Sequence, residues 1–402
     1  MRPSSRAKSS ATRAPAFPEL ESPERESLKI ESVDALFQQA GLVRSQRRSQ
    51  PRLPRPSRLA RVSPEELAPP LPVSRRAPNG VEWLPIPGWD LPWLHGGFTT
   101  RKGGLSRAYC AEGEPGELNL GFTAADDRAT VLANRRLLAE AVTGDAATPL
   151  LALKQFHSNL VVDANAADAA RSTNADAGQP GPRRADGQIT AEPGLLLAVQ
   201  TADCIPVLVA DRRQRIVAAF HAGWRGTVKR IVETGIGRMR LVFGCRPQDL
   251  IAAIGPGASA CCYSVGEEVF SEFESQFSYA RELFHEVFDS DPVKTRYPML
   301  FLTQRAPGHS PIGPSLHVDL IEANRRQLLD CGLSPRSIEI VGGCTQCQGE
   351  LFFSHRASRG HTGRMMAVIG IRKAGRIRKA GRIRKAGKTR KPAKPRSGQP
   401  QK

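Results

Sequence analysis

The sequence of 402 residues contains no long uninterrupted apolar segment: nowhere do 18 or more apolar residues follow one another. Since a helix needs about 20 predominantly apolar residues to cross a bilayer, we expect neither a membrane span nor a membrane partner. The first 20 residues also lack the apolar stretch of a secretory signal. The eight cysteines are sparse for a chain of this length, so we expect a reducing, cytoplasmic location.

Acidic residues are missing from residues 372–402, which carry 14 basic side chains and repeat the motif RIRKAG. Residues 1–80 are rich in proline, arginine and serine, with 15 basic and 8 acidic side chains. Neither end has enough apolar residues to offset the conformational entropy of folding. We therefore predict a disordered extension over 1–80, a folded domain over 81–371 and a disordered tail over 372–402. The tail either binds nucleic acid non-specifically through its charge or is solvated without a partner.

The central segment is nearly neutral, with 29 basic and 31 acidic residues, and it mixes strand-like with helical patterns. Strand-like runs at 195–202, 205–210 and 215–221 are joined by short turns, which favours antiparallel neighbours because parallel pairing needs a long crossover. In four segments, apolar residues recur at the spacing of an amphipathic helix. These segments cover 126–142, 227–243, 267–277 and 319–331. The fold class expected is α/β or α+β, a single domain of mixed sheets flanked by helices.

Three soft or borderline metal ligands each end a strand-like run. They are His157, Cys204 and His221. The gaps of 47 and 17 residues exclude a local zinc knuckle of the CxxC and HxxxH kind, so only the tertiary fold can bring the three together. Three protein ligands are what a catalytic zinc site uses, since its fourth position takes water or substrate. The alternative is that each is an ordinary core residue.

A glycine-rich turn, HAGWRGTV, follows the last of these runs and precedes a helical pattern. The backbone N–H groups of Gly226 and Thr227 at the helix start, together with the Arg225 guanidinium, form a candidate anion-binding site. The alternative is that the glycines only shape the turn and that Arg225 is solvated.

Four further cysteines occur as pairs. Cys344 and Cys347 form a CxxC motif, which can be a redox dithiol or half of a zinc site. Because the sequence has no second CxxC, we expect these two to be small residues in a tight turn. Cys261 and Cys262 are adjacent, and we expect them to pack in the protein rather than to share one metal.

Several blocks of sequence, in order, resemble the YfiH-like family. The blocks are QTADCIPVLVAD, AAFHAGWRGTV, CCYSVGEEV, GGCTQC and LFFSHRASRGHTGR, within residues 81–371. Members of that family are known as multicopper polyphenol oxidoreductases or laccases and as purine nucleoside phosphorylases. The resemblance implies a zinc-dependent enzyme that phosphorolyses adenosine, inosine and methylthioadenosine and has adenosine deaminase side activity. Its partners would be purine nucleosides and phosphate.

By motif, the metal ligands of the family fall on His157, Cys204 and His221. The family usually has glycine after the first histidine, where this chain has Ser158. A zinc ion in such a site lowers the pKa of a bound water to roughly 7, which suits deamination. Phosphorolysis needs a phosphate site instead, for which Arg225 is the first candidate. Arg101, in FTTRKGG, is the second, with a solvated loop cation as its alternative.

Two other enzyme classes remain open. A cysteine hydrolase would use Cys204 as nucleophile and His221 or His157 as base, without a metal. A copper-dependent polyphenol oxidase is less favoured, because one cysteine and two histidines cannot build several copper centres.

Overall fold

Strands β10 (Ile205–Asp211) and β11 (Ile216–Ala222) are buried along their whole length. In the computed structural model, which describes residues 59–173, 181–288 and 314–373, successive side chains of β10 enter two different cores. Val207 and Val209 pack with helices, whereas Leu208 and Ala210 pack with strands of another sheet. Since successive side chains of a strand point to opposite faces, the sheet is covered on both sides.

The described residues form two six-stranded sheets and one three-stranded sheet. The first large sheet has the order β15 (Ile338–Ile340), β12 (Leu250–Ile254), β10, β11, β8 (Gly187–Thr190) and β7 (Val161–Asp163). The second has the order β2 (Arg75–Arg76), β3 (Glu82–Pro85), β4 (Leu94–Thr99), β16 (Met365–Ile371), β9 (Leu196–Thr201) and β6 (Leu150–Ala152). The small sheet consists of β1 (Ala60–Val62), β13 (Phe284–Val287) and β14 (Ser315–Val318), and β5 (Lys102–Ser106) lies outside all three.

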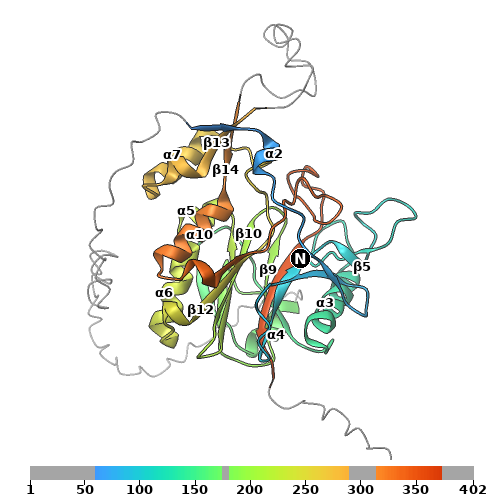
Figure 1. Cartoon of the computed structure of the whole chain (residues 1–402). Coiled ribbons are helices and arrows are strands. Elements are labelled where there is room, and N and C mark those ends of the chain that lie inside the picture. The colour runs from blue at the N-terminus through green and yellow to red at the C-terminus, as the bar shows by residue number, and fades with distance from the viewer. Residues whose placement is uncertain (1–58, 174–180, 289–313, 374–402) are drawn as a thin grey trace, which may run out of the picture. The chain divides into compact units, whose positions relative to one another are not determined.

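Helices cover the outer faces of the two large sheets, which pack on each other through a shared apolar core. On the first sheet lie α5 (Trp224–Val228), α6 (Ile231–Phe243) and α10 (Leu320–Asp330), and α7 (Glu267–Gln276) packs on α5. On the second lie α3 (Arg128–Thr143) and α4 (Ala167–Thr173) (Figure 1). The remaining short helices are α2 (Pro64–Leu67) and the 3-10 turns Pro247–Asp249, Ala280–Leu283 and Pro335–Ser337. The fold class predicted from the sequence, mixed sheets flanked by helices, is confirmed.

One predicted strand pairing is wrong. β10 and β11 are antiparallel neighbours as predicted, with Pro206 opposite His221. β9, however, pairs with β16 and β6 in the other sheet, so the chain crosses between the sheets at Ala202–Asp203. Asp203 has a φ of 98°, a conformation that non-glycine residues rarely adopt. A short turn predicts antiparallel pairing only when both strands remain in one sheet, and this turn changes sheet instead.

The helix predictions are confirmed apart from one break. The pattern at 227–243 is divided into α5 and α6, because Arg230 has a φ of 59° and ends the helical run. The predicted boundary at residue 81 is also too late, since β1, α2 and β2 all lie within the extension predicted as disordered. β1 and β2 pair with other strands through their backbones, and the sequence there contains no long apolar run. Predictions for residues 1–58 and for the basic repeats at 374–402 lie outside the described residues. None of the described helices is both long and apolar enough to span a bilayer.

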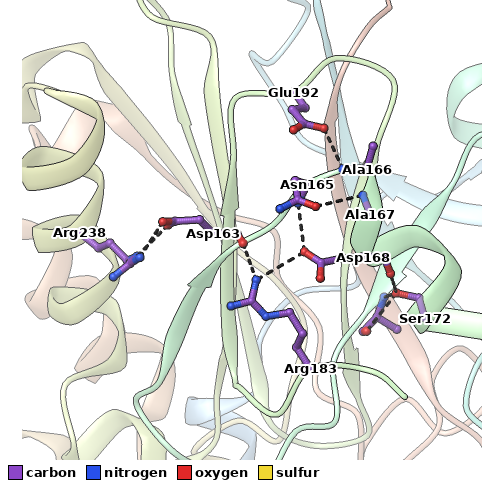
Figure 2. Close-up of polar contacts among 10 residues, drawn as sticks. Asp163, Asn165, Ala166, Ala167, Asp168, Ser172, Arg183, Glu192 and Arg238 are labelled. Carbon is purple, nitrogen blue, oxygen red and sulfur yellow. Dashed lines mark hydrogen bonds and ion pairs between the residues drawn. The ribbon is translucent and has the colours of Figure 1, made fainter. Parts of the chain in front are cut away.

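Charged side chains fix the edge of the first sheet beside β7. Arg238 of α6 donates to both carboxylate oxygens of Asp163 at 2.7 and 2.6 Å. Arg183 donates to the Asp163 carbonyl at 2.7 Å and lies 3.5 Å from Asp168 of α4 (Figure 2). These contacts tie a helix on one sheet and a helix on the other to the same strand, β7.

We expect two glycines of α6 to respond in opposite ways to alanine. A Cβ at buried Gly235 would overlap the Phe220 ring of β11, whereas a Cβ at Gly237 would meet no atom within 4 Å. Gly237→Ala should therefore raise the free energy of unfolding by about 1 kcal/mol through helix propensity. Gly235→Ala should lower it by roughly 1–3 kcal/mol, because the overpacked ring must shift. Chemical denaturation of both variants measures the difference. A stabilising Gly235→Ala would show that α6 does not pack closely on β11.

Candidate functional site

His221 is fixed at the end of β11 by a buried aspartate. Its backbone N–H donates to the Asp186 carbonyl at 2.8 Å, and its Nδ1 lies 2.9 Å from the Asp186 carboxylate. His221 is only 4% exposed. Because Nδ1 is engaged, Nε2 is the ring nitrogen left to face a ligand.

Asp186 is completely buried and contacts both His221 and the loop that carries His157. Its carboxylate accepts the backbone N–H groups of Phe156, His157 and Ser158 at 2.8–3.2 Å. It also accepts the Ser158 hydroxyl at 2.7 Å. Burial acts to raise the pKa of Asp186, but the hydrogen bonds from His221 and Ser158 outweigh it and hold the pKa well below its usual range. Asp186 therefore stays ionised and fixes both the His221 ring and the loop that carries His157.

His157 lies in the loop after β6, not at a strand end, because β6 already ends at Ala152. It has a φ of 61°, an uncommon conformation that its amide bond to Asp186 helps to hold. Its exposed imidazole places Nε2 at 3.8 Å from the Cys204 sulfur. The His157 and His221 ring centroids are 5.1 Å apart.

Cys204 enters the site where the chain crosses from β9 to β10. The preceding Asp203 accepts hydrogen bonds from the Thr345 and Ser354 hydroxyls, both at 2.7 Å, and from the Arg356 backbone N–H at 2.8 Å. These three donors hold the strained turn, and with it the direction of Cys204. A Cβ at Gly223 would lie 2.7 Å from the Cys204 sulfur, so only glycine fits beside it.

The Cys204 thiol differs electrostatically from an ordinary buried cysteine. Burial acts to raise its pKa, but the charge of His221 and hydrogen bonds from His157 and His221 lower it to about 6. Burial likewise acts to lower the pKa of His221, while the Cys204 thiolate and Asp186 raise it to about 9. At Cys245, burial and nearby Asp211 raise the pKa to about 12. Cys204 is therefore a thiolate at neutral pH, the form that binds metals and attacks electrophiles.

The structure brings the three predicted residues into one cluster. One ligand atom each from His157, Cys204 and His221 lies within 4.8 Å of the others. One thiolate and two imidazoles are a donor set that suits zinc, and a carboxylate behind the histidine is a common partner of such a ligand. The residues present therefore fit a metal ion. Reasoning from the sequence missed Asp186 and Asp203, although each aspartate stands directly beside a strand-like run.

A pocket of about 640 Å³ lies where α5 meets the loop after β12. Arg225 lines it, exposed and stacked 4.3 Å from the Trp224 ring. Arg356 lines it from the opposite segment, 4.6 Å from the Tyr263 ring. Burial first, and then the Cys204 charge, raise the pKa of Tyr263 to about 12, so its hydroxyl remains a donor. Two cations and two aromatic rings therefore line the pocket.

Arg101 does not line this pocket. Its guanidinium lies 2.6 Å from the Glu117 carboxylate and donates to the Gly349 and Tyr109 carbonyls. It also stacks 4.7 Å from the Phe353 ring. Arg225 and Arg356 are therefore the arginines that line the pocket. Of these two, reasoning from the sequence missed Arg356.

Comparison with known proteins places this chain in a family. A family model described as "Multi-copper polyphenol oxidoreductase laccase" matches residues 95–372. A protein of Bacteroides thetaiotaomicron named purine nucleoside phosphorylase is 33% identical over 68% of this chain and 90% of its own length. One of Deinococcus radiodurans with the same name is 35% identical over 73% and 94%.

Solved structures agree with these relatives. The crystal structure of the hypothetical protein YfiH of Bacillus licheniformis has a TM-score of 0.60 and 28% identity, covering 74% of this chain and 99% of that one. That of YlmD from Geobacillus stearothermophilus has a TM-score of 0.59 and 29% identity, covering 75% and 100%. This chain belongs to the YfiH-like family, whose family model carries the name multi-copper polyphenol oxidoreductase laccase.

Proposed function

We propose that the protein is a zinc-dependent purine nucleoside phosphorylase that also deaminates adenosine. Its substrates would be adenosine, inosine and methylthioadenosine with inorganic phosphate, yielding the free base and ribose 1-phosphate or its methylthio analogue. The curated relatives named purine nucleoside phosphorylase, which match over most of their length, support this class of enzyme. The catalytic unit would be the described fold from β1 to β16.

One observation carries the proposal: the convergence of His157, Cys204 and His221 from three separated segments. A structural cysteine would have a raised pKa, as Cys245 does, whereas Cys204 has a lowered one. Groups with strongly shifted pKa values that meet beside a pocket are candidates for a catalytic site. When bound, a zinc ion would supply Lewis acidity and lower the pKa of a water ligand to roughly 7.

The pocket, which includes Trp224 and Arg225 shortly after His221 in the chain, suits a nucleoside and an anion. Trp224 and Tyr263 line it with aromatic rings that a purine can contact, and Arg225 and Arg356 offer charge for phosphate. In phosphorolysis a phosphate oxygen attacks C1′ of the ribose, the bond from C1′ to N9 breaks, and the purine leaves and takes up a proton. In deamination, water supplies the oxygen that replaces the C6 amine, which leaves as ammonia.

The ligand set supports zinc over copper. Among the residues that the structure describes, two groups of cysteine, histidine and acidic side chains can hold a metal, and only one of them contains histidine. A multicopper oxidase needs several copper centres rich in histidine, which these groups do not provide.

A cysteine hydrolase without a metal is the second candidate. The lowered pKa of Cys204 and the raised pKa of His221 are the values that a thiolate and imidazolium pair would have. The two candidates differ in their dependence on metal.

Cys204→Ala should remove one zinc per chain and abolish both reactions, because two remaining ligands cannot hold the ion tightly. Elemental mass spectrometry gives the metal content. Chromatography of reactions with adenosine should detect adenine only in phosphate buffer and inosine in either buffer. Cys110→Ala, which removes a half-buried cysteine elsewhere, is the control and should change neither result. Full activity after chelation of all metal would favour the cysteine hydrolase.

Asp186→Asn should weaken zinc binding about 10- to 100-fold, because the His221 ring and the His157 loop lose their charged acceptor. The measurement is competition for zinc with a chromophoric chelator. Asp211→Asn is the matched control, since Asp211 is also fully buried and accepts the backbone N–H groups of Arg213 and Gln214. Both variants should lose stability. Equal zinc affinities in the two would assign Asp186 to folding alone.

Arg225→Ala should raise the KM for phosphate about 10- to 150-fold, which corresponds to a charged hydrogen bond of roughly 1.5–3 kcal/mol. Deamination should change little, since it needs no phosphate. Steady-state kinetics with phosphate as the varied substrate gives the first value, and phosphate-free buffer gives the second. Lys229→Ala removes an exposed charge just after α5 and serves as control. Equal losses in both reactions would give Arg225 a structural role.

A further inference from the structure

Four cysteines form a cluster that is separate from His157, Cys204 and His221. Cys261 and Cys262 come from the loop after β12, and Cys344 and Cys347 come from the loop after β15. Their four sulfur atoms all lie within 4.8 Å of one another. The sequence predicted separate packing and turn residues, and the fold instead joins the two pairs. Cys261 and Cys344 are buried, Cys262 is half-buried and Cys347 is exposed.

The sulfur atoms are too far apart for disulfide bonds, and their spacing is close to that of four thiolates around a tetrahedral ion. The Cys347 sulfur lies 3.3 Å from that of Cys261 and 3.0 Å from that of Cys262. A disulfide bond would need about 2.05 Å. Four sulfurs at about 2.3 Å from a zinc ion lie about 3.8 Å from one another, so the cluster needs only a small expansion to enclose the ion.

Backbone contacts build this cluster independently of its thiols. Gly257 and Cys344 form a parallel bridge, and the Thr345 N–H donates to the Gly257 carbonyl at 3.0 Å. The Cys262 N–H donates to the Ser259 carbonyl at 3.0 Å, which turns the second pair toward the first. Gly343, with a φ of 104°, allows the chain to approach Phe352 where a Cβ would collide.

We propose that Cys261, Cys262, Cys344 and Cys347 bind one zinc ion in a closed four-thiolate site. Tetrahedral sulfur ligation without an open position is the arrangement of structural zinc. Exposed Cys347 gives the ion its entry path. The site is separate from His157, Cys204 and His221, and it does not depend on the reaction proposed above.

Binding of zinc would affect the segment 344–356, which contains Cys344 and Cys347. Thr345, Ser354 and Arg356 all donate hydrogen bonds to Asp203, the residue before Cys204. A zinc ion that joins the loops after β12 and β15 would therefore hold the donors that shape the turn at Cys204. We expect loss of this ion to lower the melting temperature and to slow, but not abolish, the reactions.

The test starts from the full-length Cys204→Ala protein, in which the other metal site has lost a ligand. This protein should retain about one zinc per chain, and adding Cys262→Ser with Cys347→Ser should remove it, as measured by elemental mass spectrometry. Cobalt reconstitution of the first protein should give the intense charge-transfer and visible bands of several thiolates on one tetrahedral ion. Adding Cys110→Ser with Cys331→Ser instead removes two half-buried cysteines outside the cluster and should leave the zinc in place.

Three outcomes would overturn the proposal. They are a Cys204→Ala protein free of zinc, zinc retained without Cys262 and Cys347, and an intact mass lower by two hydrogens that maps to a disulfide within the cluster. If the combined variant does not fold, Cys347→Ser alone decides the matter, since this exposed side chain supports no core packing. It should weaken zinc binding in chelator competition and reduce the cobalt bands, and unchanged binding would refute the site.

Discussion

The buried carboxylate of Asp186 is the interaction on which the arrangement of the site depends. An ionised group with no exposed surface would destabilise the fold by several kcal/mol unless its oxygens were satisfied. Here three consecutive backbone amides, the Ser158 hydroxyl and the His221 ring satisfy them. The charge therefore cannot be compensated unless the His157 loop and the end of β11 come together. Forming the fold and bringing the two histidines into one cluster are the same event.

Asp203 is also a carboxylate held by several hydrogen-bond donors, on the other side of the cluster. Its carboxylate accepts two hydroxyls and one backbone N–H from the segment 345–356, and so fixes a turn with a positive φ. That turn carries the chain from one large sheet to the other and leaves Cys204 at the start of β10. The two aspartates thus hold one thiolate and two imidazoles together at the edge between the two packed sheets. The lowered pKa of Cys204 is a result of this convergence, because the charge of His221 produces it.

Much of this arrangement could be predicted from sequence, and its failures have physical reasons. Periodicity located α3, α7 and α10 because each has one apolar face. It could not show that β9 and β10 belong to different sheets, because the choice depends on which core each strand enters, a property of distant partners such as β16. Nor could it detect the break at Arg230, since a positive φ at a charged residue leaves no mark in hydrophobic spacing.

The site residues follow the same division. Cys204 and His221 could be found as candidates because they border apolar strands, whereas His157, which lies in the loop after β6, could be found because the family resemblance places a ligand there. Asp186 and Asp203 were missed because an aspartate beside a strand is ordinary in sequence, and only the number of donors around it reveals its importance. The four-cysteine cluster was missed because its pairs lie more than 80 residues apart, with the Cys262 and Cys347 sulfurs brought together by two backbone turns.

The two candidate metal sites differ in how many coordination positions the protein fills. Three protein ligands leave a fourth position for water or substrate, whereas four thiolates leave none. The segment 344–356 connects them, since it supplies two sulfurs to one cluster and three hydrogen bonds to the turn that carries Cys204. The four-cysteine site would therefore support the site at Cys204 through the backbone of this segment rather than through shared ligands. Rigid support of this kind matters most at Cys204, because its turn has a strained conformation that the surrounding contacts must hold.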